Sequence, residues 1–234
     1  MIGQWIEIAM FKKSPEQVAK EASMKDGFIN VAIAALVLGI VSSILAGIAM
    51  IVSGGITGGV GGLGAGIIGA IVTFIITIIA APIMAVIGLA ICAGIVHIVA
   101  KVLGGKGSYG NMVGTIGVIG ASISMTYMLA LEVISGVIGI FAIGPIAFVI
   151  ALILVPVALV KFVASLIELF LTIKGIAAVQ KLSFLKAALA IIIPAIIIGI
   201  IVAIFVVIAI VIVGAAAIAG IAGSSGLDGL FGLM

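Results

Sequence analysis

The sequence has few of the charged side chains that a water-soluble surface needs. Only 7% of its 234 residues are charged, whereas 66% are hydrophobic and another 33 residues are glycine. A soluble domain is typically about 25% charged, and a disordered chain is poor in large hydrophobic residues. The composition therefore excludes both classes and predicts an integral membrane protein, whose first partner is the lipid bilayer.

The chain lacks arginine and contains one cysteine and one histidine. Cys92 cannot form an intrachain disulfide, and we expect a small buried hydrophobic residue there. The histidine has no hydrolase partner motif, and no cluster of His, Cys, Asp and Glu has metal-ligand spacing. We therefore predict no enzyme, no cofactor and no metal site. The small net charge of +3 indicates membrane topology rather than a nucleic-acid partner.

Long apolar runs divide the chain into spans. A hydrocarbon core of about 30 Å requires about 20 mostly apolar residues per helix. Five segments qualify, at about residues 28–51, 67–100, 112–134, 145–173 and 185–216. The predicted fold is therefore all-α, a polytopic membrane protein with five transmembrane helices over residues 28–216. Whether 161–174 crosses the membrane or lies at its interface is left open.

The lysines predict the orientation of these spans. Nine of the ten lysines precede the first span, lie between the second and third, or lie at or between the fourth and fifth. Lysine collects in the short cytoplasmic loops of membrane proteins. We therefore expect a cytoplasmic N-terminus, an external C-terminus and five crossings. In a prokaryote, the membrane would be the plasma membrane.

Residues 1–27 are predicted to form a short cytoplasmic amphipathic segment. Ile2, Trp5 and Ile6 begin a helical apolar pattern that continues at Ala9 and Met10, and we expect this stretch to lie along the membrane surface. Ser14-Pro15-Glu16-Gln17 then has the pattern of a capping box, which starts a second helix.

Glycine-rich stretches resemble nucleotide motifs without their context. Residues 54–66 contain GxGxxG, but an apolar helix precedes it where a strand is required, and GGKGS at 104–108 lacks the order of a phosphate loop. We expect 52–66 to be a flexible external loop, whose entry into the membrane is left open, and 217–234 to be a glycine-rich external tail. Gly110 and Gly114 indicate close helix packing, either inside the protein or in a homo-oligomer.

Four ionisable side chains fall within the predicted spans, and each is a functional candidate because it is costly to place in hydrocarbon. His97 and Glu168 lie at similar depths if their helices end near Lys101 and Lys174, so we predict that they pair. Glu132 lies near the external end, where it reaches water. The candidate intramembrane polar site consists of His97, Glu168, Lys161, Ser165, Thr115 and Ser122. The alternative is that these polar stripes only hold the helices together.

Three segments carry a resemblance to one family. HIVAKVLGGKGSYGNMVGTIG at 97–117, IELFLTIKGIAAVQKLSFLKAALAI at 167–191 and FKKSPEQVAKEA at 11–22 resemble segments of the Yip family, the Ypt/Rab-interacting integral membrane proteins. The resemblance covers about residues 11–210 and implies a Yip domain with two cytoplasmic loops. Eukaryotic members bind small GTPases and act in vesicle traffic and membrane shaping, whereas prokaryotic members, which this chain is more similar to, have no agreed activity.

Two functions follow from these features. The leading hypothesis is a non-catalytic membrane scaffold of the Yip type, which organises the membrane or recruits a cytoplasmic protein. Its candidate partner loops contain Lys101, Gly104, Gly105, Lys106, Tyr109, Gly175, Gln180, Lys181 and Lys186. The alternative is a small-solute or ion transporter or channel that uses the polar stripes of the third and fourth spans.

Overall fold

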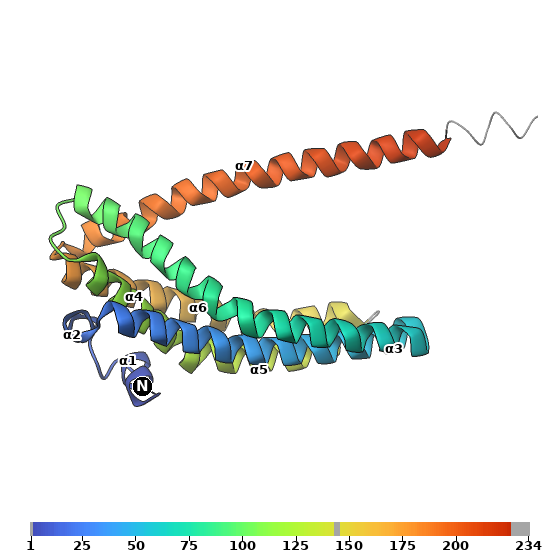
Figure 1. Ribbon diagram of the computed structural model, residues 1–234, viewed down its shortest axis with the longest axis horizontal. Coiled ribbons are helices and arrows are strands. Elements are labelled where there is room, and N and C mark those ends of the chain that lie inside the picture. Colours follow the sequence, from blue (N-terminus) through green and yellow to red (C-terminus); the bar gives the residue numbers. More distant parts are fainter. Residues whose placement is uncertain (1, 143–145, 226–234) are drawn as a thin grey trace, which may run out of the picture. The chain divides into compact units, whose positions relative to one another are not determined.

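The computed structural model describes residues 2–142 and 146–225, and the protein is all-α, with 91% of the described residues helical. No strand occurs in these two ranges. Figure 1 shows the helices α1 (Ile2–Ala9), α2 (Pro15–Glu21), α3 (Met24–Val102), α4 (Tyr109–Ile123), α5 (Leu129–Ile140), α6 (Ala147–Gln180) and α7 (Phe184–Ser225), with a π-helical turn η1 (Ser124–Met128) joining α4 to α5. The chain divides into two compact units, Met1–Ala190 and Ile191–Met234.

Within the first unit, α1 packs against α4, and α2 packs against α4 and α6. The capping box is confirmed, because the Ser14 side chain accepts from the Gln17 amide and the Gln17 side chain accepts from the Ser14 amide. The surface helix is only partly as predicted. Trp5 and Ile8 are buried in α1, whereas Ile6 is exposed. Trp5 is therefore a core residue rather than an interfacial one, and its indole N–H donates to Asn30 Oδ1 at 2.6 Å.

Helix α3 is a hairpin of two antiparallel limbs. A straight helix of its 79 residues would be about 118 Å long, far more than a bilayer requires. The chain reverses at Gly59, whose φ of 56° and ψ of −141° lie outside the helical region. The limbs contact each other through the pairs Gly54 and Gly62, Gly47 and Ala70, and Gly39 and Ala81. In each pair, the two residues are separated from Gly59 by similar numbers of residues.

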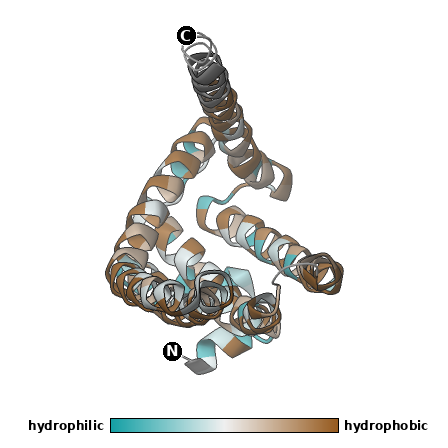
Figure 2. Cartoon of the chain, turned by 90° about the vertical axis from the view of Figure 1, so that its right-hand side faces the viewer, coloured by the Kyte–Doolittle hydropathy of each residue, from teal (hydrophilic) through white to brown (hydrophobic). Residues whose placement is uncertain are grey.

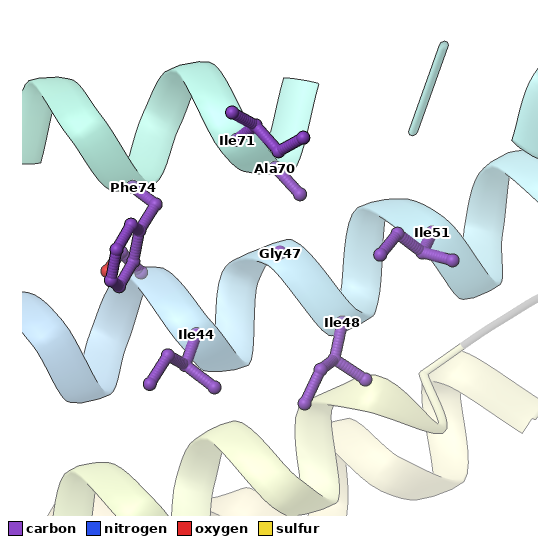
Figure 3. A pocket seen from close by; sticks show the side chains of 8 residues that line it. Ile44, Gly47, Ile48, Ile51, Ala70, Ile71 and Phe74 are labelled. Carbon is purple, nitrogen blue, oxygen red and sulfur yellow. The ribbon is translucent and has the colours of Figure 1, made fainter. Parts of the chain in front are cut away.

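The hairpin corrects the prediction for residues 52–66. These residues are helical on both sides of Gly59 rather than a flexible loop. A Cβ atom on Gly62 would collide with the carbonyl oxygen of Gly54, so only glycine lets the limbs approach this closely here. Figure 3 shows the limbs further from the reversal, where Ile44, Ile71 and Phe74 line an apolar pocket of about 250 Å³.

Helix α4 occupies the centre of the first unit, in contact with α1, α2, α3 and α6. A Cβ on Gly114 would meet the Ser23 carbonyl oxygen at 2.5 Å, and one on Gly117 would meet that of Gly27 at 2.6 Å. Gly175 of α6 packs equally closely against Thr115. The small residues of the third predicted span therefore serve packing within the chain.

Four helices are long and apolar enough to cross a membrane: α3, the continuous α4–η1–α5 segment, α6 and α7. Their large exposed side chains are mostly hydrophobic. Figure 2 shows that hydrophobic residues predominate along the long helices. The protein is therefore a multi-pass integral membrane protein. Cys92 is exposed on α3, so the prediction that it is buried was wrong.

The helices run beyond the predicted spans. Helix α5 continues to Ile140 and α6 to Gln180, into segments that we expected to be loops. Helix α7 continues to Ser225, so residues 217–225 of the predicted tail are helical. Residues 226–234 of that tail lie outside the described residues. In the second unit, the side chains from Ala195 to Val211 are exposed, and all of them are apolar or glycine.

Candidate functional site

Gln180, at the end of α6, joins two loops that are far apart in the sequence. Its side chain is fully buried. Its Oε1 accepts from the Gly107 amide at 3.0 Å, and its Nε2 lies 3.0 Å from His97 Nδ1. An amide nitrogen only donates, so Nδ1 accepts and the neutral histidine carries its proton on Nε2. The Gln180 carbonyl also accepts from the Lys106 amide at 2.9 Å.

The segment 103–108 between α3 and α4 is closed against the end of α6. The amides of Gly104 and Gly105 donate to Lys101 and Ala100 at the end of α3, and those of Lys106 and Gly107 donate to Gln180. Four consecutive amides are thus bonded within the protein. Because a phosphate loop needs free amides, this bonding agrees with the rejection of GGKGS as a phosphate motif.

Glycine is required where segment 103–108 touches α6. A Cβ on Gly105 would lie 2.6 Å from Gln180 Oε1, and one on Gly107 would collide with the Val179 carbonyl oxygen. Tyr109 secures the other side, because its hydroxyl donates to the Ala90 carbonyl at 2.8 Å. Its ring also meets the His97 ring edge-on, with the centroids 5.8 Å apart. These contacts fix segment 103–108 in one arrangement.

Lysines surround this closed segment. Lys101, Lys106, Lys181 and Lys186 are exposed, and none of them forms an ion pair with a described carboxylate. Lys186 reaches across to the Leu103 carbonyl at 3.3 Å. We name residues 103–108, Gln180 and these four lysines the loop platform. The loop platform therefore combines exposed positive charge with a backbone segment that is held in place by hydrogen bonds.

The predicted pair of His97 and Glu168 is not found among the described hydrogen bonds, and His97 bonds Gln180 instead. The depth estimate was wrong because α6 ends at Gln180 rather than near Lys174. Glu168 therefore lies about 18 Å from the end of its helix, whereas His97 lies about 8 Å from the end of α3. Glu168 is level with Gly120, where an added Cβ would meet its Oε1 at 3.3 Å.

Lys161 has a partner that sequence reasoning missed. Its Nζ donates to Glu132 Oε2 at 3.0 Å and to Ser135 Oγ at 2.9 Å. Glu132 was expected to reach water near the external end. Lys161 lies about 28 Å from the end of α6 at Gln180, and Glu132 lies about 34 Å from the start of α4 at Tyr109. Both helix ends adjoin the loop platform, so correct helix lengths would have placed the two residues at similar depths.

The remaining predicted polar residues bond to their own helices. Thr115 and Ser122 are fully buried, and their hydroxyls donate to the carbonyls of Asn111 and Val118 at 2.8 and 2.6 Å. Ser165 is exposed and donates to the Lys161 carbonyl at 3.0 Å. Such bonds satisfy a hydroxyl within one helix. The stripe containing Thr115 and Ser122 therefore has its hydroxyl protons directed at the backbone rather than at a solute.

No group of three or more His, Cys, Asp and Glu able to hold a metal occurs within 2–142 and 146–225. Comparison with models of protein families, with curated proteins and with solved structures found no match. The Yip resemblance therefore rests on the sequence segments alone. Several residues that carry it, including His97, Gly105, Tyr109 and Gln180, lie together in or beside the loop platform.

Proposed function

We propose that the protein is a non-catalytic membrane scaffold of the Yip type, which recruits a cytoplasmic protein through the loop platform. The observation that carries this proposal is the buried Gln180, which bonds Gly107 and His97 and so joins the two lysine-bearing loops. Because these hydrogen bonds already order the two loops, binding a partner there would cost little conformational entropy. Four lysines that form no ion pair with a carboxylate of residues 2–142 and 146–225 suit an acidic surface on the partner.

The proposed topology has five crossings. Each limb of α3 is long enough to span a bilayer, so the hairpin supplies two spans while α4–η1–α5, α6 and α7 supply three. Under the positive-inside rule, the loop platform and the N-terminus face the cytoplasm, and the Gly59 reversal and the C-terminus face outward. In a prokaryotic cell this is the plasma membrane.

Photo-crosslinking in native membranes tests the proposed recruitment. A photoreactive residue replaces exposed Ser108 or Ser183 in the full chain, and adducts are identified by mass spectrometry. We expect the same protein adduct from both positions, and we expect its yield to fall at least about tenfold when Lys101, Lys106, Lys181 and Lys186 become glutamine, because the attraction between charges is lost.

The matched control neutralises three other exposed lysines, Lys12, Lys20 and Lys25, on the same predicted side of the membrane. The protein adduct should persist in this variant. Lipid adducts alone, or equal loss in both variants, would contradict recruitment through the platform.

A further inference from the structure

A second cavity of the first unit lies beside the ion pair of Lys161 and Glu132. It measures about 400 Å³ and opens between α3, α5 and α6. Its lining includes Leu38 and Ser42 from the first limb of α3, Thr77 from the second limb, Glu132 from α5 and Lys161 from α6. We name this cavity the charged cleft. Its volume lies within the range of about 300–1,000 Å³ that is typical of small-molecule sites.

The ion pair has unused hydrogen-bonding capacity. Lys161 has three ammonium protons, of which one bonds Glu132 Oε2 and another bonds Ser135 Oγ. Among the described residues, no bond uses the third proton or Glu132 Oε1. One charged donor and one charged acceptor thus belong to side chains that line the same cavity. The two side chains are 32% and 38% exposed, so the unused donor and acceptor are accessible to a ligand.

The charged cleft continues toward Glu168. A neighbouring cavity of about 270 Å³ shares Ala35 and Leu38 with it and includes Glu168 and Ser124. Lys161 and Glu168 are seven residues apart on α6, which places them on one face of the helix about 10 Å apart along its axis. Ionisable groups therefore line two adjoining cavities within an otherwise apolar bundle.

We propose that the charged cleft binds a small zwitterion, a molecule that carries an ammonium group and an oxyanion close together. The oxyanion accepts the third proton of Lys161, and the ammonium group donates to Glu132 Oε1. A ligand of single charge would add a net charge to a site of low dielectric constant, whereas a zwitterion leaves the net charge unchanged. This site uses none of the loop-platform residues, so it stands independently of the proposed scaffold function.

Ligand-dependent melting of the full chain in detergent tests the proposal. The probes are L-alanine, which has a carboxylate, and glycerophosphoethanolamine, which has the phosphate and ammonium of a lipid headgroup. Acetate and ethylamine are the single-charge controls. We expect at least one zwitterion to raise the melting temperature, by about 5–10 °C at a hundredfold excess over its Kd, and the two controls to leave it unchanged. The zwitterion that acts distinguishes a free solute from a headgroup.

Two variants connect the shift to the cleft. Lys161→Met/Glu132→Leu removes both charges together, which leaves no unpaired ion and is expected to preserve folding. It should lose the ligand-induced shift, whereas Ser165→Ala, at an exposed position of the same helix that is not among the lining residues of the cleft, should keep it. No shift with either zwitterion in the wild type would overturn the proposal. Equal shifts with acetate and ethylamine, or a shift that survives in the double variant, would overturn it too.

Discussion

Individual polar residues connect the helices and loops of this apolar chain through hydrogen bonds. The clearest is Gln180, which has three hydrogen bonds to the segment before α4 and to His97. Sequence patterns alone did not indicate this role, because a glutamine near a helix end is ordinary. The family resemblance did select Gln180, together with Gly105 and Tyr109, but it did not indicate that Gln180 bonds His97.

Replacing Gln180 by alanine should destabilise the protein. The Gly107 amide and His97 Nδ1 would each lose a partner, and both residues are half-buried. An unsatisfied group costs about 1–3 kcal/mol when buried, so we expect the lower end of this range for each. The melting temperature should fall by about 4–8 °C. Gln17→Ala is the matched control, because Gln17 is exposed and only completes a helix cap. An equal effect of both substitutions would contradict the role of Gln180.

Trp5, the only tryptophan, reports whether α1 packs on protein or on lipid. Its side chain is 4% exposed and bonds Asn30. We expect brominated lipids to quench its fluorescence weakly. In the variant Trp5→Phe/Ile6→Trp, the indole moves to a position that is 45% exposed, and quenching should increase severalfold. Strong quenching of the wild-type protein would show instead that Trp5 lies in the membrane interface.

At the scale of elements, the sequence was most informative about long apolar helices and least informative about their ends. Apolar length alone indicated the long apolar helices, because a helix satisfies its backbone hydrogen bonds within one segment inside a bilayer. It could not show where each helix stops in water. Helix α6 continues past Lys174 to Gln180, and this single error of length produced the mistaken pairing of His97 with Glu168.

The glycine-rich stretch shows the same limit. Glycine is typical both of flexible loops and of close helix contacts, and composition does not distinguish them. One signal in the sequence favours the helix contact over the loop: the glycines at 54 and 62 lie at equal distances from position 58, as residues that meet across a hairpin do. The structure shows that the stretch forms the end of a tight helical hairpin.

The hairpin predicts different outcomes for two glycines only two positions apart. Gly62→Ala should separate the limbs, because the new Cβ collides with the Gly54 carbonyl, and overpacking of this kind costs about 1–3 kcal/mol. Gly64→Ala meets open space and should be neutral or stabilise by up to about 1 kcal/mol. Thermal unfolding of the two variants in one detergent measures the difference. Identical melting temperatures would argue against the contact between the limbs.

At the scale of the whole molecule, two groups of charged side chains are central to the proposals. One is the loop platform with four exposed lysines, and the other is the charged cleft with Lys161 and Glu132. The proposed scaffold function needs the platform to face the cytoplasm as one surface. That requirement depends on α3 crossing the membrane twice, which the reversal at Gly59 permits.

Labelling of single cysteines in intact cells, with an impermeant thiol reagent and a Cys92→Ala background, tests this arrangement most directly. The positions are Val60 beside the reversal, Lys106 and Lys181 in the loop platform, and Gly139 near the end of α5. We predict that Val60→Cys and Gly139→Cys react from outside, whereas Lys106→Cys and Lys181→Cys react only after the cells are opened. Labelling of Lys106→Cys and Val60→Cys from the same side would contradict the account.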